Sequence, residues 1–326
     1  MRPGRILRIQ LVTPAPPRSR AGNRVTATRW ARLLRGLGHR VRITTCLDPR
    51  PTDVLVALHA RRSAAAVAEF VSAHPDVPVV VVLTGTDLYQ DLPRSAAAQN
   101  SLALATRLVV LQSEALRSIP RRHRLKSRVI VQSATRVSPR RRTCEQQDGR
   151  YFRICIMGHL RAVKDPFLLV EALRLLPSES RVRVTHLGAA IEPGMADRAH
   201  REMEADPRYR WVGERPRWSA LRTLARSDLS VLTSRLEGGA NVVSEAIAAG
   251  VPVLATRIPG SVGLLGQDYP GYYPVGNARR LAHCVQRFEP DPPFRLELQD
   301  WMRRLEPLVD PRRERRAWVQ LLAELA

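Results

Sequence analysis

The sequence predicts an α/β protein built from two doubly wound domains, each with a parallel sheet that is covered by helices on both faces. Apolar strand-like segments alternate with helix-like segments along the whole chain, which is typical of parallel sheets. The alternation restarts after a polar, basic stretch at 138–150, and a chain of 326 residues exceeds one ordinary hydrophobic core. We expect the two domains to face each other across a cleft, because such sheets bind ligands beyond the carboxyl ends of their strands.

The first half of the chain predicts an N-terminal domain at 1–139. Short apolar and β-branched runs predict strands at 8–13, 40–45, 54–58, 79–83, 108–111 and 128–131. Helical periodicity predicts helices at 26–37, 63–72 and 113–118, with Gly38 placed to end the first of them. The residues 140–150 lack any periodicity and are expected to be the linker.

The second half repeats the same pattern and predicts a C-terminal domain at 151–310. Its expected strands are 153–157, 181–187, 209–212, 229–233 and 251–255, and its expected helices are 166–176, 196–205, 219–226 and 242–249. Two or three helices follow Tyr272-Tyr273-Pro274, and the last occupies 311–325. The segment 311–326 is expected to be a C-terminal helix that can pack back on the N-terminal domain.

The charge of the chain favours small anionic ligands over nucleic acid. The formal net charge is +23, yet lysine occurs only at Lys126 and Lys164, and the arginines are spread along the whole chain instead of forming one stripe. Aromatic residues make up 5% of the chain, which leaves few surfaces for stacking on bases. The positive charge would raise the encounter rate with anionic small molecules, and we expect no nucleic-acid partner.

Composition also argues against a membrane anchor, a zinc site and a disulfide framework. The hydrophobic content is 44%, and the longest apolar run, 77–83, is far too short to span a bilayer. Arg8 and Gln10 interrupt any signal-peptide core. The four cysteines, Cys46, Cys144, Cys155 and Cys284, show no C-x-x-C spacing. We therefore expect a cytoplasmic protein without a bound metal and without stable membrane anchoring.

The most informative motif is SRLEGGANVVSEAIAAGVPVLATRIPG at 234–260. A Gly-rich turn that opens a helix gathers unpaired backbone N–H groups at the positive end of the helix dipole, which suits a diphosphate. Glu245 follows Asn241 by four residues and shares its helix face, where its carboxylate could accept hydrogen bonds from ribose hydroxyls. The residues expected to bind here are Glu237, Gly238, Gly239, Ala240, Asn241, Val242 and Glu245.

A second motif, GHLRAVKDP at 158–166, directly follows the first strand of the second domain. It begins at Gly158 and is expected to open a helix with Pro166 at its first position. Arg161 and Lys164 then lie in a strand-end loop, where a guanidinium fork and an ammonium could clamp a diphosphate.

Three further segments follow strands of the first domain and are expected to project into the cleft. The first contains Gly22-Asn23, the second His59, Arg61 and Arg62, and the third Thr84 and Asp87. Arg61 and Arg62 could form an anion pocket on the acceptor side. A lone histidine at a strand end is more often structural, so both a catalytic and a structural role stay open for His59.

The motifs at 158–166 and 234–260 resemble the G-x-L-x-x-x-K and E-x7-E signatures of retaining GT-B glycosyltransferases of the GT4 type. The resemblance implies two Rossmann-like domains and a UDP-sugar donor. In that family, Arg161 and Lys164 would stabilise the departing UDP, Glu245 would bind ribose and Glu237 would orient the sugar. The chain departs from the family at Asn23, where Gly-Gly is usual, and at Thr84, which replaces a histidine.

The combination of GNRVTATRWARLL, LHARRSA, LTGTDLYQD, GHLRAVKDP and LEGGANVVSEA looks like the GT4-like selenosugar synthases of selenoneine biosynthesis. This resemblance implies transfer of a sugar from UDP-GlcNAc or UDP-glucose to selenophosphate. The product would be a 1-seleno-sugar with a carbon–selenium bond, and UDP would leave without any metal or further cofactor. Three alternatives stay open: a GT4-like enzyme with another small-molecule or lipid acceptor, an epimerase that acts on the donor alone, and a nucleic-acid-binding protein.

Overall fold

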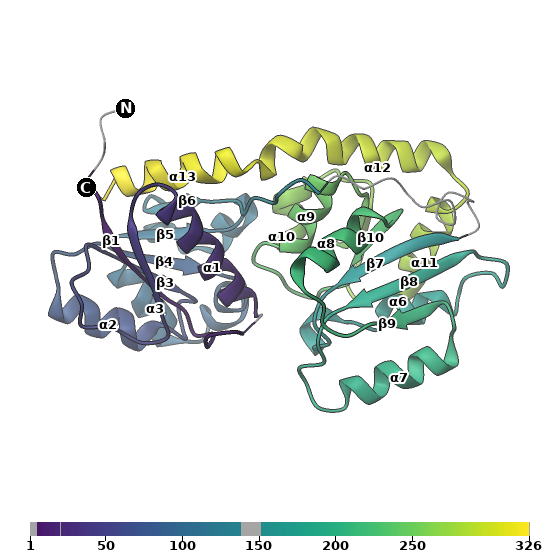
Figure 1. Ribbon diagram of the computed structural model, residues 1–326, viewed down its shortest axis with the longest axis horizontal. Helices are drawn as coiled ribbons and strands as arrows, with labels where there is room; N and C mark the ends of the chain where they lie inside the picture. The colour runs from purple at the N-terminus through teal and green to yellow at the C-terminus, as the bar shows by residue number, and fades with distance from the viewer. Residues whose placement is uncertain (1–4, 20, 138–150, 326) are drawn as a thin grey trace. The chain divides into compact units, whose positions relative to one another are not determined.

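The computed structural model describes residues 5–19, 21–137 and 151–325, and these residues form two compact units (Figure 1). Unit 1 comprises Met1–Val131 and Glu314–Ala326, and unit 2 comprises Gln132–Arg313. Each unit contains its own parallel sheet of 6 strands. The expected linker at 140–150 lies outside the described residues. Within those described ranges, no helix combines the length and the apolar character needed to cross a bilayer.

The sheet of unit 1 has the strand order β2-β1-β3-β4-β5-β6. Its strands are β1 (Arg8–Val12), β2 (Arg40–Thr44), β3 (Val54–Leu58), β4 (Val79–Leu83), β5 (Arg107–Val110) and β6 (Ser127–Val129). Its helices are α1 (Gly22–Arg35), α2 (Ala64–Ala73), α3 (Ala96–Leu104) and α4 (Arg121–Arg124), joined by α13 (Pro311–Ala323) from the end of the chain. The chain runs from β1 to β2 on one side and then from β3 onward on the other, so the direction reverses between β1 and β3.

Alternate residues of the unit 1 strands face two different helix layers. Val54, Val56 and Leu58 of β3 belong to one apolar cluster with residues of α1 and α13. Leu55 and Ala57 of the same strand belong to a second cluster with residues of α2 and α3. Burial on both faces explains why these strands are continuous apolar runs, as expected for a parallel sheet between helices.

The C-terminal helix α13 completes the core of unit 1. The Trp318 side chain is fully buried, and its ring contacts that of Trp30 edge to face at a centroid distance of 4.9 Å. The Trp30 indole N–H donates to the buried Glu314 carboxylate over 2.7 Å. The last helix of the chain is therefore part of the same hydrophobic core as the first strands.

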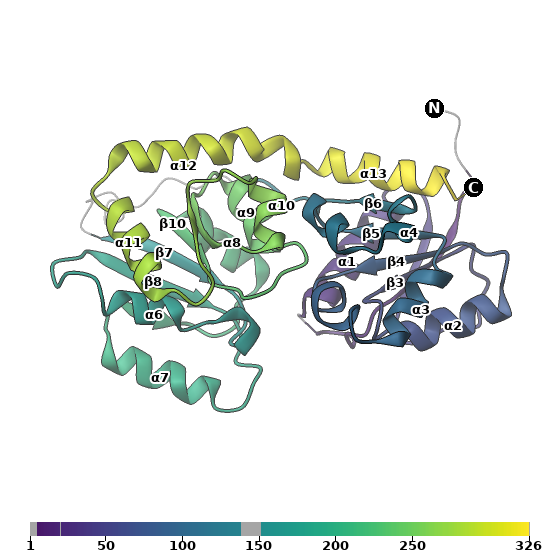
Figure 2. The ribbon, with the colours of Figure 1, turned by 180° about the vertical axis from the view of Figure 1, so that it is seen from behind.

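The sheet of unit 2 has the strand order β12-β11-β10-β7-β8-β9. Its strands are β7 (Phe152–Met157), β8 (Val182–Leu187), β9 (Tyr209–Trp211), β10 (Leu229–Leu232), β11 (Val253–Thr256) and β12 (Tyr272–Tyr273). Its helices are α6 (Leu168–Leu173), α7 (Met195–Ala205), α8 (Arg217–Ala225), α9 (Asn241–Ala249), α10 (Pro259–Leu265), α11 (Ala278–Phe288) and α12 (Pro292–Leu305) (Figures 1 and 2). This is the doubly wound dinucleotide-binding order, and its direction reverses between β7 and β10.

The predicted fold class, two parallel-sheet α/β domains, is confirmed, while two expected helices have different boundaries and one helix was not predicted. The helix expected at 26–37 spans Gly22–Arg35 instead: the backbone of Ala21 is outside the helical region, and the helix ends before Gly36 and Gly38, the latter with a φ of 94°. The helix expected to open at Pro166 begins at Leu168, because Asp165 adopts a left-handed backbone with φ of 46° and turns the chain. Helix α3 was missed, since its Ala-rich sequence has almost no amphipathic periodicity.

We predict that Trp318→Ala lowers the free energy of unfolding of unit 1 by about 3–5 kcal/mol, the usual cost of removing a buried tryptophan. Trp218→Ala is the matched control, because Trp218 is 63% exposed on α8 and should change stability by less than about 0.5 kcal/mol. Hydrogen exchange of the β1 and β3 amides in increasing urea measures the effect. Equal exchange rates in the two variants would contradict this assignment of the core.

Candidate functional site

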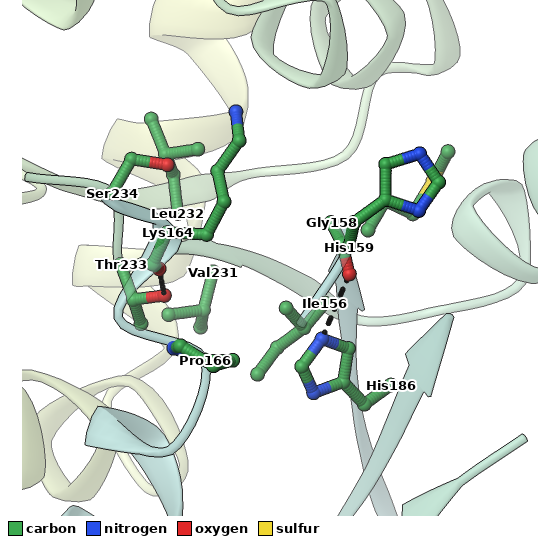
Figure 3. A pocket seen from close by; sticks show the side chains of 11 residues that line it. Ile156, Gly158, His159, Lys164, Pro166, His186, Val231, Leu232, Thr233 and Ser234 are labelled. Carbon is green, nitrogen blue, oxygen red and sulfur yellow. Dashed lines mark hydrogen bonds between the residues drawn. The ribbon is translucent and has the colours of Figure 1, made fainter. Parts of the chain in front are cut away.

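A pocket opens in unit 2 at the carboxyl ends of β7 and β10, where the winding direction of the sheet reverses. Loops at such a reversal point leave in opposite directions, which leaves a crevice for a ligand. The lining residues come from β7 and the loop after it, from β8, and from β10 and the loop after it. Figure 3 shows Lys164 and Ser234 on one side of this pocket and His159 and His186 on the other.

The loops after β7 and β10 are bonded directly to each other. The Thr233 hydroxyl donates to the Lys164 carbonyl over 2.7 Å, and the Arg235 N–H donates to the Val163 carbonyl over 2.9 Å. The Arg235 guanidinium also pairs with the Asp165 carboxylate at 2.8 Å. These contacts fix the loop that carries Lys164 against the loop that carries Glu237.

The Lys164 ammonium forms an ion pair with the Glu237 carboxylate. The Ser234 hydroxyl donates to the same Glu237 oxygen over 2.7 Å, so one carboxylate oxygen is shared by an ammonium and a hydroxyl. Lys164 remains 29% exposed at the pocket, where its charge can also reach an anionic ligand. Sequence reasoning identified Lys164 and Glu237 and missed Ser234, although Ser234 opens the same motif.

The first turn of α9 presents backbone donors beside Glu237. Ala240 precedes the helix and offers no side-chain acceptor, and Val243 N–H is the first in the helix to bond back, to the Ala240 carbonyl over 2.9 Å. The N–H groups of Asn241 and Val242 therefore lie at the positive end of the helix dipole. This arrangement of a Gly-rich turn and a helix start agrees with the geometry expected from the sequence.

Gly260 allows helix α10 to approach the backbone of Glu237. A Cβ atom built at this position would lie 2.3 Å from the Glu237 carbonyl oxygen and 2.8 Å from its Cβ. Any larger residue would have to displace Glu237. The sequence motif ends on this glycine, but its contact with Glu237 depends on a packing distance that the sequence does not contain.

Glu245 lies one turn into α9, and its side chain is almost completely buried. One of its oxygens pairs with an Arg217 guanidinium nitrogen at 2.5 Å. Arg217 begins α8, so two helices that are separate in the sequence bring this pair together. Sequence reasoning missed Arg217, because no local pattern connects it with Glu245.

Arg161 lies in the loop after β7 and is partly exposed. Its Nε atom is 3.8 Å from the Glu192 carboxylate, which also accepts the Ala162 N–H over 2.8 Å. Glu192 was not identified from the sequence. It orients the loop that contains Arg161 while leaving the guanidinium exposed enough for a ligand phosphate to compete for it.

The floor of the pocket is held by a buried, neutral histidine. His186 bonds through Nε2 to the Gly158 carbonyl over 3.1 Å and through Nδ1 to the Tyr209 hydroxyl over 2.9 Å. Burial lowers the pKa of His186 to about 4. Gly188 directly follows β8, and a Cβ atom built there would lie 1.9 Å from the same Gly158 oxygen. This position therefore requires a glycine.

The predicted residues of unit 1 lie at the carboxyl ends of its strands. Gly22 and Asn23 form the first turn of α1, while His59 and Arg61 follow β3 and Thr84 and Asp87 follow β4. His59 and Asp87 are almost completely buried, whereas Arg61 is exposed. The structure thus brings His59, Arg61, Thr84 and Asp87 together in two neighbouring loops, whereas Gly22 and Asn23 belong to α1.

No group of three or more histidine, cysteine, aspartate or glutamate side chains that could hold a metal ion occurs among residues 5–19, 21–137 and 151–325. Three carboxylates in the segments that follow β7 and β10 are instead paired with cations: Glu237 with Lys164, Glu245 with Arg217 and Asp165 with Arg235. These carboxylates are therefore arranged to position cations and to accept hydrogen bonds.

Comparison with known proteins shows the family to which the chain belongs. The family model described as glycosyl transferases group 1 matches residues 140–303, a range that contains every predicted site residue of unit 2. HepE from Anabaena, solved in complex with UDP-glucose, has a TM-score of 0.73 at 15% identity, over 98% of this chain and 99% of that chain. Sucrose-phosphate synthase from Thermosynechococcus elongatus has a TM-score of 0.77 at 14% identity, over 98% and 99% of the two chains. At these identities the likeness shows the fold, which is that of GT-B glycosyltransferases.

We predict that His186 makes the stability of unit 2 depend on pH. Its folded-state pKa of about 4 lies below its ordinary value of 6.5. The stabilisation that the neutral ring contributes to the free energy of unfolding is therefore complete above pH 6.5 and is lost as the pH falls toward 4. His186→Gln keeps a donor for Gly158 but does not titrate. The free energy of unfolding of unit 2, measured in urea, should fall more steeply across this window in the wild type than in the variant. Equal slopes would contradict the buried, neutral state of His186.

Proposed function

This chain belongs to the glycosyl transferase group 1 family, and we propose that it transfers a sugar from a UDP-sugar bound at the unit 2 pocket. The observation that carries the proposal is the convergence of Lys164, Glu237 and the α9 N-terminus at the reversal point of the unit 2 sheet. Neighbouring structures with UDP and UDP-glucose support UDP as the nucleotide.

The diphosphate of the donor would lie between the loop after β7 and the first turn of α9. Arg161 and Lys164 would contact its phosphate oxygens, and the N–H groups of Asn241 and Val242 would donate to it. Glu245 would accept hydrogen bonds from the ribose hydroxyls in place of Arg217. Glu237, held by Lys164 and Ser234, would orient the donor sugar.

The reaction breaks the bond between the anomeric carbon and the diphosphate oxygen, and the electron pair leaves with UDP. Negative charge therefore grows on the leaving group in the transition state, where Arg161 and Lys164 stabilise it more than in the ground state. No metal is needed in this scheme, because the two side-chain cations and the helix N-terminus together neutralise the diphosphate.

We further propose that the acceptor is selenophosphate, with UDP-GlcNAc or UDP-glucose as the donor. A selenium lone pair would attack the anomeric carbon and form a carbon–selenium bond as UDP leaves, which gives a Se-phosphorylated selenosugar. Water would then cleave the selenium–phosphorus bond and release inorganic phosphate, which leaves the 1-seleno-sugar for selenoneine biosynthesis. The sequence resemblance to selenosugar synthases supports this acceptor, and so do Arg61 and Arg62 beside the unit 1 sheet, since they suit a small, highly charged anion. The alternative is a GT4-like transferase with another small-molecule or lipid acceptor.

Mass spectrometry tests the proposal directly. The purified protein is incubated with UDP-GlcNAc or UDP-glucose, with and without selenophosphate generated in situ. A selenium-containing sugar and UDP that form only when both substrates are present would support the proposed acceptor. UDP release that depends on a different acceptor would reject selenophosphate and retain the transferase. No turnover of any nucleotide sugar with any acceptor would contradict both.

We predict that Lys164→Met lowers kcat/KM for the UDP-sugar by about 10²–10³, the usual effect of removing one group that stabilises transition-state charge. Lys126→Met is the matched control, because Lys126 is the other lysine of the chain and its ammonium bonds to the carbonyls of Ala103 and Ala105 in unit 1. It should leave kcat/KM unchanged.

We also expect Arg161→Ala to resemble Lys164→Met, while His59→Ala costs only about tenfold, as for one lost hydrogen bond. Steady-state kinetics with both substrates measures these ratios. Loss of turnover in His59→Ala together with near-normal Arg161→Ala would overturn this assignment of roles.

A further inference from the structure

A buried carboxylate joins two strand-end loops of unit 1. Asp87 is fully buried, and its Oδ1 accepts the N–H groups of Thr84 over 2.9 Å and Gly85 over 2.8 Å. Its Oδ2 accepts the N–H of Ala60, in the loop after β3, over 2.9 Å. A buried carboxylate is costly unless hydrogen bonds satisfy it, and here three backbone donors from two loops do so. Asp87 therefore has no surface with which to contact a ligand.

The loop after β3 is held in a strained conformation. His59 has a φ of 75°, which non-glycine residues adopt at a cost of about 1–3 kcal/mol and only where the surroundings enforce it. Its N–H donates to the Val82 carbonyl over 2.9 Å, and the Ser101 hydroxyl donates to the Ala60 carbonyl over 2.7 Å. Together with Asp87, these bonds fix the backbone on both sides of His59.

The His59 ring links the same two loops and does not reach solvent. It is 2% exposed, its Nδ1 accepts the Arg62 N–H over 3.3 Å, and its Nε2 lies 3.1 Å from the Thr86 hydroxyl. Because Nδ1 accepts, the proton resides on Nε2 and is donated to Thr86. Burial lowers the pKa of His59, which agrees with a neutral ring that makes both bonds.

The network presents two arginines and one threonine at or near the surface. Arg61 is 47% exposed, and its Nε atom pairs with the Asp91 carboxylate at 2.8 Å. Arg62 is exposed beside it, and Thr84 is partly exposed on the neighbouring loop. These residues follow β3 and β4, at the carboxyl edge of the unit 1 sheet, where parallel sheets bind ligands.

We infer that Asp87 and His59 are positioning residues that hold Arg61 and Thr84 as the binding edge for a small tetrahedral oxyanion, the acceptor of the transfer reaction. This inference rests on the proposed function. His59 and Asp87 do not contact the substrates directly, and their role is to fix the two loops. Arg61 and Thr84 touch the acceptor, and Arg62 adds positive charge beside them.

The test uses thiophosphate as the probe, because it has the shape and charge of selenophosphate. Amide NMR shifts of the full chain are followed during titration of the wild type, Asp87→Asn and Asp53→Asn. Asparagine can keep an acceptor for Thr84 and Gly85, but its NH₂ group then faces the Ala60 N–H. Asp53 is the matched control, because its carboxylate accepts the Arg8 N–H over 2.7 Å just before β3, at the opposite edge of the same sheet.

We expect shifts at residues 59–62 and 84–86 in the wild type and a Kd for thiophosphate that is at least about tenfold higher in Asp87→Asn, as for one lost hydrogen bond to a charged group. Asp53→Asn should keep the wild-type Kd. Equal Kd values in all three proteins, or shifts confined to other residues, would overturn the inference.

Two further variants keep the test decisive if Asp87→Asn does not fold. Thr86→Val removes only the hydroxyl that His59 contacts and should also raise the Kd, while Arg61→Ala should raise it most. The double variant Thr86→Val/Arg61→Ala should lose less than the sum of the two single losses, because Thr86 acts partly through Arg61. Fully additive losses would overturn the inference.

Failure of the inference is distinguishable from failure of the proposed function, because UDP is titrated separately. Unchanged UDP binding with no thiophosphate binding at residues 59–62 and 84–86 would reject the inference alone. Thiophosphate binding at this edge without any binding of UDP at the unit 2 pocket would instead reject the proposed function.

Discussion

The whole structure depends on one constraint of parallel sheets: the carboxyl ends of all strands lie at the same edge, where ligands bind, above all where the winding direction reverses. In unit 2 this point lies between β7 and β10, and the loops after these strands carry Lys164 and Glu237. In unit 1 it lies between β1 and β3, and His59 and Arg61 follow β3. The same topological rule therefore places the polar residues of both units.

Cations at the unit 2 pocket are held by carboxylates before any nucleotide arrives. Lys164 pairs with Glu237 and Arg217 with Glu245, while Arg161 lies near Glu192. The Lys164–Glu237 and Arg161–Glu192 pairs are partly exposed and therefore weak, so a diphosphate can compete for Lys164 and Arg161 at little cost. Glu245, in contrast, is almost completely buried in its pair with Arg217. The carboxylates that are released can then accept hydrogen bonds from sugar and ribose hydroxyls. In this way the same charges order the loops and bind the nucleotide.

The sequence allowed prediction of those parts of the site that are close together along the chain. The turn and helix around Gly239, and the loop from Gly158 to Lys164, could be identified because strand, loop and helix follow one another. The Arg217–Glu245 pair and the contact of Gly260 with Glu237 depend on how separate helices pack, which local patterns do not contain. The burial of His59 was likewise hidden, because a strand-end position does not reveal the direction of the ring.

Hydrogen exchange with and without UDP tests the central claim most directly, because it reports on each loop separately. UDP is expected to slow exchange in the loop after β7, at 158–165, and in the segment 237–245, while the strand-end loops of unit 1 exchange as before. Uridine, which lacks the diphosphate, should protect these segments far less. Protection by UDP that is absent from both segments, or equal protection by uridine, would contradict diphosphate binding at the reversal point of the unit 2 sheet.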